Sequence, residues 1–333
     1  MILSEAHALF RELCDGSERF VLTTHINPDG DALGSQFSLA RFLASRGKQV
    51  RIINQDATPD ILSFIEDAEL PVEIYEPATH DPIIAGADLV VLVDNSAPDR
   101  LGEMESPMLA AADHTLCIDH HPSRETPWAH HILDEDASAA AAMIFELTRP
   151  YHWTPDARSA AAMYVGLATD TGFFRFNSTN ARSHEVAAEL LRLGADPAKT
   201  FQSVYERNSL AYTRLLGHAL VGLTLEAGGA IVLVKITLGQ LKALDAEQVD
   251  TSEITTSLLA MDGVRLALLF RELPGGRIKV SLRSKGDLDV HRLAATFGGG
   301  GHRNASGIVM PGELNEVVKA VTHKAASLLA AGG

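Results

Sequence analysis

Short apolar runs and amphipathic segments alternate along the first two thirds of the chain. The apolar runs predict strands over residues 19–24, 49–53, 89–93, 115–118 and 131–133. Segments with apolar residues every three to four positions predict helices near residues 31–46, 138–148, 155–168, 181–193 and 197–207. Continuous apolar strands separated by helices are typical of a parallel sheet with both faces covered. We therefore expect an α/β fold in this part of the chain.

The pattern changes near residues 208–217. Beyond them, strand-like runs on either side of paired glycines predict two hairpins, 220–225 with 230–236 and 265–272 with 277–282. Further helices are predicted near residues 251–260 and 314–330. This second part therefore predicts a smaller α+β domain. The expected organisation is a first domain over residues 1–207, a linker over 208–217 and a second domain over 218–333.

Length, charge and cysteine content narrow the class of protein. A chain of 333 residues is longer than one compact core usually holds, which agrees with two domains. The formal net charge of −15 argues against a protein that coats long duplex DNA. Two cysteines exclude a disulfide scaffold. The first residues do not resemble a signal peptide, and no apolar run approaches the ~18–20 residues of a membrane span, so we expect a cytoplasmic protein.

Acidic and histidine side chains follow three of the predicted strands, and another aspartate ends a predicted helix. These residues are His25, Asp29, Asp31, Asp94, Asp119, His120, His121 and Asp170. The carboxyl ends of parallel strands meet at one edge of a sheet, where ligands bind in open α/β folds. These residues also have structural interpretations, because Asp31 can cap the following helix, Asp29 can accept from loop amides and Asp94 can hold a turn.

Six of these side chains form a candidate metal-binding set: His25, Asp29, Asp31, Asp94, His120 and Asp170. Carboxylates and imidazoles without thiolates suit manganese, with magnesium or cobalt as other possibilities. Four carboxylates balance two divalent cations, and two ions about 3.5–4 Å apart can activate water and stabilise an in-line phosphoryl displacement. One carboxylate must then bridge the ions, and we expect Asp94, alone at the end of a central strand, to do so. Asp119 can orient a neighbouring imidazole.

A glycine run lies in the one segment where basic residues outnumber acidic ones, between Arg265 and Arg303. Residues 298–307 have the sequence Gly-Gly-Gly-Gly-His-Arg-Asn-Ala-Ser-Gly. Glycines let the backbone approach a ligand and offer amides to an anion, and arginine suits phosphate. A flexible loop and a solvated basic face are the alternatives. The candidate substrate-binding residues are Arg283, Ser284, Gly300, Gly301, His302, Arg303, Asn304 and Ser306.

The acidic and histidine motifs resemble those of the DHH phosphoesterase superfamily, and residues 298–307 resemble the signature of its associated C-terminal domain. The likeness extends over about residues 10–330, and two domains without a further module look like the nano-RNase (oligoribonuclease) and pAp-phosphatase branch. It implies an active cleft between the domains and catalytic roles for His121, Asp94 and Asp119. It also implies that one ion binds His25, Asp29 and Asp94, and the other Asp31, Asp94, His120 and Asp170. A homodimer is a further expectation from the family.

The resemblance implies a manganese-dependent hydrolase of oligoribonucleotides about two to five nucleotides long. Its products would be 5′-mononucleotides, and it would also act as a pAp phosphatase. An aromatic content of 6% argues against a long groove that stacks many bases. Phe173, Phe174 and Phe176, beside Asp170, can stack one base or belong to the core.

Three other functions compete with this one. The nearest is a phosphodiesterase for cyclic di-AMP or its linear product pApA. An inorganic pyrophosphatase should have a denser basic cluster, and a nucleotide-binding module without catalysis should have lost metal ligands. Two stretches also depart from the family pattern, with Pro-Ser-Arg at 122–124 and Ala-Ser-Ala-Ala-Ala-Ala at 137–142. Neither removes a proposed metal ligand, so they bear on substrate preference.

Overall fold

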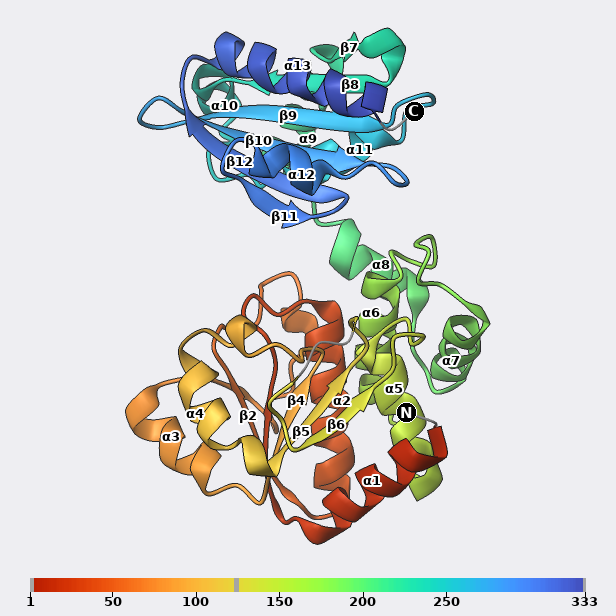
Figure 1. Ribbon diagram of the computed structural model, residues 1–333. Coiled ribbons are helices and arrows are strands. Elements are labelled where there is room, and N and C mark those ends of the chain that lie inside the picture. Colours follow the sequence, from red (N-terminus) through yellow and green to blue (C-terminus); the bar gives the residue numbers. More distant parts are fainter. Residues whose placement is uncertain (1–2, 123–125, 332–333) are drawn as a thin grey trace. The chain divides into compact units, whose positions relative to one another are not determined.

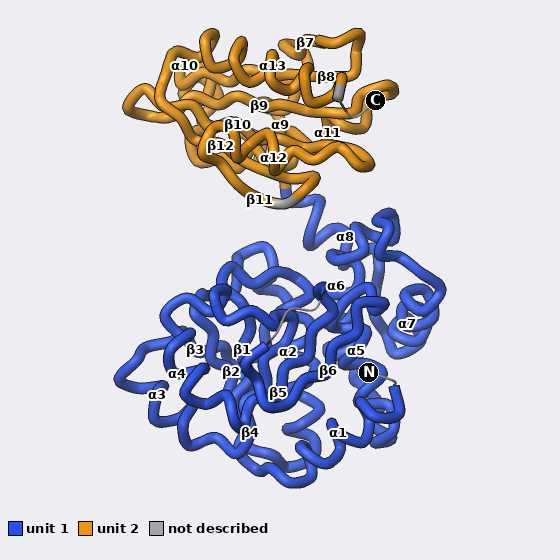
Figure 2. The backbone as a smooth tube through the Cα atoms, viewed as in Figure 1, with its two compact units in different colours: residues 1–207 blue, residues 208–333 orange. Residues whose placement is uncertain are grey.

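The computed structural model describes residues 3–122 and 126–331 (Figure 1). Two positions of the unusual Pro-Ser-Arg stretch, Ser123 and Arg124, lie outside the described residues. The chain divides into two compact units, which we call unit 1 (Met1–Arg207) and unit 2 (Asn208–Gly333) (Figure 2). Each unit has its own sheet and its own hydrophobic core. Within the described residues, no helix combines the length and apolar character that crossing a bilayer requires.

Unit 1 is built on a six-stranded parallel sheet with the strand order β3-β2-β1-β4-β5-β6. The strands are β1 (Arg19–Thr23), β2 (Gln49–Asn54), β3 (Val72–Ile74), β4 (Leu89–Val93), β5 (Thr115–Asp119) and β6 (His130–Leu133). The predicted α/β class with a parallel sheet is therefore confirmed. Strand β3 was not predicted, because it is short and only partly buried at the sheet edge.

Helices cover both faces of this sheet (Figure 1). One core contains side chains from α1 (Leu3–Gly16), α2 (Gly30–Ser45), α5 (Ala140–Thr148), α6 (Ala157–Asp170) and α7 (Ala181–Arg192). The opposite core contains side chains from α3 (Pro77–Ala85) and α4 (Glu105–Ala110). Strand β4 serves both, because Val91 and Val93 lie in the first core and Val90 and Leu92 in the second. Helix α8 (Pro197–Tyr205) completes unit 1.

The strand order places a topological switch point between β1 and β4. From β1 the chain moves outward to β2 and β3, and it then returns to the other side of β1 to form β4, β5 and β6. At such a point the loops leave neighbouring strands in opposite directions and open a crevice at the carboxyl ends. The loop after β1 and the residue after β4, Asp94, both lie at that edge.

Unit 2 contains a second six-stranded sheet with the order β11-β12-β10-β9-β8-β7, in which β8 and β9 pair in parallel and the other neighbouring strands pair antiparallel. Its strands are β7 (Thr224–Glu226), β8 (Ile231–Ile236), β9 (Leu266–Leu273), β10 (Arg277–Ser284), β11 (Gly300–His302) and β12 (Ala305–Pro311). Its helices are α9 (Leu210–Val221), α10 (Leu238–Ala243), α11 (Ser252–Leu259), α12 (Val290–Ala295) and α13 (Leu314–Ala331). Both predicted hairpins are present, as β7–β8 and β9–β10.

Two segments of unit 2 differ from the sequence-based expectation. Helix α9 occupies most of the expected linker and the start of the expected strand over 220–225, because Leu215 and Ala219, one helical turn apart, are both buried. Two glycines of the run, Gly300 and Gly301, belong to β11, which pairs with β12, so this part of the run is a strand rather than a loop. Glycine is required there because a Cβ at Gly301 would lie 2.5 Å from the carbonyl oxygen of Ala305.

Candidate metal centre

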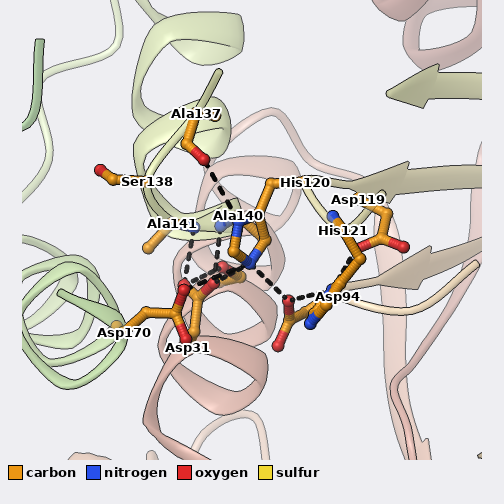
Figure 3. A network of polar contacts seen from close by, with 12 residues as sticks. Asp31, Asp94, Asp119, His120, His121, Ala137, Ser138, Ala140, Ala141 and Asp170 are labelled. Carbon is orange, nitrogen blue, oxygen red and sulfur yellow. Dashed lines mark hydrogen bonds and ion pairs between the residues drawn. The ribbon is translucent and has the colours of Figure 1, made fainter. Parts of the chain in front are cut away.

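The structure gathers the predicted acidic and histidine side chains at the carboxyl edge of the parallel sheet. They are His25, Asp29 and Asp31 after β1, Asp94 after β4, Asp119 to His121 at the end of β5, and Asp170 at the end of α6. Figure 3 shows those of Asp31, Asp94, Asp119, His120, His121 and Asp170. Thr24 connects the loop after β1 to the end of β4, because its hydroxyl donates to the carbonyl of Val93 at 2.8 Å. Asp94 itself has a φ of 56°, a left-handed conformation that aspartate tolerates better than most residues.

Glycines allow the helices behind the cluster to approach closely. A Cβ on Gly30 would lie 2.5 Å from Oγ1 of Thr169, so the start of α2 packs directly against the end of α6. A Cβ on Gly166 would lie 2.8 Å from Oδ1 of Asp31 and 2.7 Å from Cβ of Ala141. The spacing of Asp31 and Asp170 therefore depends on small residues at this helix contact.

Asp94 divides the cluster into two groups of possible ligands. Its Oδ2 lies 3.6 Å from Nε2 of His25, and the same nitrogen lies 3.9 Å from Oδ2 of Asp29. Its Oδ1 lies 3.3 Å from Nε2 of His120. That nitrogen also lies 3.6 Å from Asp31 Oδ2 and 3.4 Å from Asp170 Oδ2. The two oxygens of Asp94 thus face His25 with Asp29 on one side, and His120 with its two carboxylates on the other.

Backbone amides hold two of the carboxylates in place. Asp31 is buried, and its two oxygens accept from the N–H groups of Ala140 and Ala141 at 2.6 and 2.9 Å, at the start of α5. Asp29 caps α2 through Oδ1, which accepts from Asp31 and Ala32 at 3.0 and 3.1 Å. The N-cap of α2 is therefore Asp29, and the capping interpretation of Asp31 is wrong, because Asp31 already lies inside the helix. The other oxygen of Asp29 still faces His25. The two alanine amides were not anticipated, because the sequence does not indicate which distant carboxylate meets a helix start.

Several buried polar atoms of the cluster have no hydrogen-bond partner in the part of the chain that the structure describes, and they could bind divalent cations. Nε2 of His25, Nε2 of His120 and Oδ1 of Asp94 are buried and have no hydrogen-bond partner among the described residues. Buried polar atoms are normally paired, so three such atoms at one place indicate a missing ligand. The other ring nitrogen of each imidazole lies near a backbone carbonyl, Ile26 for His25 at 2.7 Å and Ala137 for His120 at 3.2 Å. This arrangement orients Nε2 of both rings toward the carboxylates.

The pKa shifts within the cluster also favour a bound cation. Burial and the charges of Asp94 and Asp170 raise the pKa of Asp31 well above its usual value. Burial also raises the pKa of Asp170, to about 6. Burial opposes ionisation of Asp94 as well, but the imidazoles of His120 and His25 lower its pKa to about 2. Ionisation of Asp31 and Asp170 is therefore unfavourable beside the other carboxylates, and a bound cation would remove this penalty.

His121 differs from the other histidines in being 44% exposed. Its Nδ1 lies 2.8 Å from Oδ1 of Asp119, which also accepts from the His121 backbone N–H at 3.2 Å. Asp119 is fully buried at the end of β5. The carboxylate thus fixes the orientation of His121, and Asp119 itself belongs to none of the groups of described residues that could hold an ion.

Unit 2 brings the predicted substrate-binding residues to one corner of its sheet. The end of β10, with Arg283 and Ser284, pairs with the start of β12, and β12 pairs in turn with β11. Arg303, in the turn between β11 and β12, is 59% exposed, and its guanidinium donates to the carbonyl of Asp287 at 3.0 Å. The side chain of His302 lies outside the described part of the structure.

Three polar residues of that set have structural contacts. The Nδ2 group of Asn304 lies 2.9 Å from both Oγ of Ser284 and the carbonyl oxygen of Gly286, so it braces the loop after β10. Ser284 is buried and donates to the carbonyl of Leu288 at 2.6 Å. Ser306 is also buried. Among the described side chains of this set, Arg303 is exposed, whereas Arg283 is partly buried and its guanidinium donates to the carbonyl of Leu282 at 3.1 Å.

Comparison with known proteins agrees with the site. Residues 19–167 match the DHH family, N-terminal domain, and residues 231–327 match the DHHA1 domain. The bifunctional oligoribonuclease and PAP phosphatase NrnA of Thermus thermophilus is 31% identical over 296 residues, which are 87% of this chain and 84% of that protein. The cyclic-di-AMP phosphodiesterase GdpP of Geobacillus thermodenitrificans is 28% identical over 310 residues, which are 89% of this chain and 45% of that protein.

A solved structure extends the likeness to three dimensions. An exopolyphosphatase-related protein from Bacteroides fragilis superposes with a TM-score of 0.89 at 30% sequence identity. The match covers 97% of this chain and 96% of that one. With both domain models matched in order and a relative of similar length above 30% identity, the chain belongs to the DHH phosphoesterase superfamily, among the members that carry a DHHA1 domain.

Proposed function

We propose that the protein is a two-metal phosphoesterase that hydrolyses oligoribonucleotides of a few nucleotides to 5′-mononucleotides and removes the 3′-phosphate of pAp. The observation that carries this proposal is the position of Asp94, whose two carboxylate oxygens face two separate groups of possible ligands. Because the ligands are carboxylates and imidazoles without thiolates, the proposed cation is Mn²⁺, with Mg²⁺ or Co²⁺ as substitutes.

The distances define the proposed ligand sets. One ion would be held by His25, Asp29 and Asp94, and the other by Asp31, His120 and Asp170, with Asp94 shared. When bound, such ions would lower the pKa of water and stabilise charge on the phosphoryl oxygens. The amides of Ala140 and Ala141 keep Asp31 in place during this chemistry.

The position of His121 suits direct contact with the substrate. Its Nδ1 is held by the buried carboxylate of Asp119, so the ring presents its other nitrogen from a partly exposed position. There it would contact the scissile phosphate or donate a proton to the leaving oxygen. Asp119 would keep the tautomer and orientation that this proton transfer requires.

The preference for short substrates rests on charge and on the relatives. NrnA of Thermus thermophilus, named as an oligoribonuclease and PAP phosphatase, is similar over most of its length. The chain carries a net charge of −15, so a long polyanion would be repelled except near the arginines of unit 2. We propose that Arg283 and Arg303 hold the end of the substrate that is not cleaved. We further propose that the enzyme acts in the cytoplasm, and that it does so as a homodimer, as the family suggests.

A cyclic di-AMP or pApA phosphodiesterase is the second candidate. It is favoured by the likeness to GdpP, which extends over 89% of this chain. The same cluster and the same arginines would serve this reaction, since the bond cleaved is again a phosphodiester. The two candidates therefore differ in substrate fit rather than in chemistry.

A substrate panel tests both candidates. The full chain would be assayed with Mn²⁺ on a ribodinucleotide, a much longer RNA strand, pAp, pApA, cyclic di-AMP and pyrophosphate, with Asp94→Asn as the background control. We expect the highest kcat/KM for the dinucleotide and pAp, and a much lower value for the long strand. Preference for cyclic di-AMP or pApA would assign the second candidate, and absence of all turnover in the metal-loaded protein would contradict both.

A further inference from the structure

The loop after Asp170 has an unusual backbone. Gly172, Phe173 and Phe174 are three consecutive residues with positive φ, at 56°, 54° and 64°. Phenylalanine rarely adopts this left-handed region, so two in succession store strain. Thr171 holds the turn: its carbonyl accepts from the N–H groups of Arg175 and Phe176 at 3.0 Å each, and its hydroxyl accepts from Phe174 N–H at 3.1 Å. Such strain persists where the surroundings enforce it, which is commonly at functional sites.

The turn sends its three phenylalanines to different environments. Phe173 packs edge-on against Phe201 and Tyr205, with ring centroids 5.1 and 5.2 Å apart. Phe174 stacks on His184 at 5.0 Å. Both lie against the unit 1 core, whereas Phe176 stays 51% exposed. Of the two interpretations that the sequence leaves open, packing therefore applies to Phe173 and Phe174 and not to Phe176.

Phe176 is exposed but not loosely held. A Cβ on Gly172 would lie 2.5 Å from Cζ of Phe176, so the ring rests directly on the glycine backbone. The Ser178 hydroxyl lies 3.5 Å from the carbonyl oxygen of Asp170, which closes the loop on the residue where it began. An apolar ring is thus fixed, with much of its surface in solvent, a few residues from a proposed metal ligand.

A cation accompanies the ring. The guanidinium of Arg175 lies over the ring of Phe176, 5.6 Å from its centroid. Arg175 is exposed and forms no ion pair with any residue that the structure describes. An aromatic face beside an unpaired guanidinium suits a nucleotide, which presents a base for stacking and a phosphate for the cation. A purely structural role would not require either group to face solvent.

We propose that Phe176 is the stacking surface for the base of the nucleotide whose phosphate is cleaved, and that Arg175 contacts a phosphate of the same substrate. This inference rests on the proposed function, because it requires a nucleotide at the Asp94 cluster. Phe176 then acts as a specificity-determining residue that distinguishes nucleotides from other phosphate esters. Arg175 contributes affinity that does not depend on the base.

Abasic dinucleotides test the stacking directly. The Mn²⁺-loaded full chain would be assayed on a dinucleotide and on two analogues that lack the base at the 5′ or the 3′ position. We expect the wild type to cleave the dinucleotide about tenfold better than one of the two analogues, as loss of one base stack predicts. Phe176→Ala should lose that factor and Phe176→Trp should keep it. Arg175→Gln should raise KM equally on all three substrates.

Phe64→Ala is the matched control. Phe64 is also partly exposed, at 39%, but it lines a cavity beside Arg41 and Lys199, and neither Arg175 nor Phe176 lines that cavity. It should leave the preference for the base unchanged. An unchanged preference in Phe176→Ala would overturn the proposal. So would a uniform loss on all three substrates, which would indicate that the ring only supports the fold.

Binding separates this inference from the proposed function. If the wild type cleaved no dinucleotide, the proposed function would fail, and equilibrium dialysis of AMP and of ribose 5-phosphate against the Mn²⁺-loaded full chain would test the stacking alone. Tighter binding of AMP that disappears in Phe176→Ala supports the stacking. Equal binding of both ligands to the wild type, or a preference that survives in the variant, would refute it.

Discussion

At the scale of single residues, one carboxylate organises the proposed metal centre. Asp94 is buried, and it lies between the imidazoles of His25 and His120, at 3.6 and 3.3 Å. These imidazoles lower its pKa to about 2 although burial opposes ionisation, so Asp94 is negatively charged at neutral pH. An ionised carboxylate with one oxygen toward each group can bridge two cations, which an amide of the same shape cannot do.

Asp94→Asn should therefore abolish turnover and lower the amount of bound Mn²⁺, while the fold stays intact. The substitution preserves side-chain volume and removes only the charge and one acceptor oxygen. Measurements of kcat on the dinucleotide, of metal per chain by atomic emission, and of the far-UV circular dichroism spectrum would check each part. Turnover near the wild-type rate would show that Asp94 does not bridge.

Asp119→Asn should act differently, because Asp119 holds His121 and lies outside the proposed ligand groups. Loss of a carboxylate that orients a histidine typically costs about 10–100-fold in activity. We expect that loss in kcat, with the Mn²⁺ content unchanged. Asp113→Asn, an exposed aspartate before the opposite end of β5, is the control and should be neutral. A parallel fall in bound metal would place Asp119 among the ligands instead.

At the scale of elements, the contact between α2 and α6 sets the geometry of the cluster. Asp31 lies in the first turn of α2, and Asp170 is the last residue of α6. A Cβ at Gly34 would lie 2.3 Å from the backbone carbonyl oxygen of Ala162, which cannot move without shifting α6. The close approach of these helices thus depends on the absence of a side chain at Gly34.

Gly34→Ala should lower the free energy of unfolding of unit 1 by about 1–3 kcal/mol, the usual cost of overpacking. The direction of the stability change is informative, because replacing glycine by alanine within a helix otherwise stabilises it by up to about 1 kcal/mol. Gly217→Ala is the matched control: Gly217 lies within α9, and a Cβ there meets nothing within 4 Å. Urea titrations would compare the two variants. A stabilised Gly34→Ala protein would contradict the packing described for α2 and α6.

The same elements show what the sequence could predict. Strands β1, β4 and β5 are continuous apolar runs followed by acidic or histidine residues, so the sheet edge and the residues gathered there were expected from local pattern. The junction of Asp31 with the amides of Ala140 and Ala141 was not, because it joins residues 109 and 110 positions apart. Strand β11 was missed for a related reason, since its glycines have no strand propensity and pair only because β12 is beside them.

At the scale of the whole molecule, the two units carry different parts of the proposed function. All proposed metal ligands belong to unit 1, and Arg283 and Arg303 belong to unit 2.

Arg303→Ala should therefore raise KM on the dinucleotide, roughly tenfold for one charge-assisted hydrogen bond, and leave the Mn²⁺ content unchanged. Arg277→Ala, an exposed arginine at the other end of β10, is the control. Wild-type kinetics of Arg303→Ala on every substrate would remove Arg303 from the substrate site.

Metal binding should stabilise unit 1 selectively. A ligand that binds only the folded state adds about 2.7 kcal/mol at a hundredfold excess over its Kd, and this gain applies to the unit that holds the site. The two tryptophans, Trp128 and Trp153, both lie in unit 1, so their fluorescence follows the unfolding of that unit alone. Circular dichroism at far-UV wavelengths follows both units.

Urea unfolding with Mn²⁺ and with EDTA, followed by both signals, should therefore give two results. Mn²⁺ should move the fluorescence midpoint to higher urea, and it should move only part of the circular dichroism change. In Asp94→Asn the metal-dependent shift should shrink or vanish, because the shared ligand has lost its charge. If both signals moved together by the same amount in the wild type, the two units would unfold as one cooperative body. If neither signal moved, the cluster in unit 1 would not be a metal site.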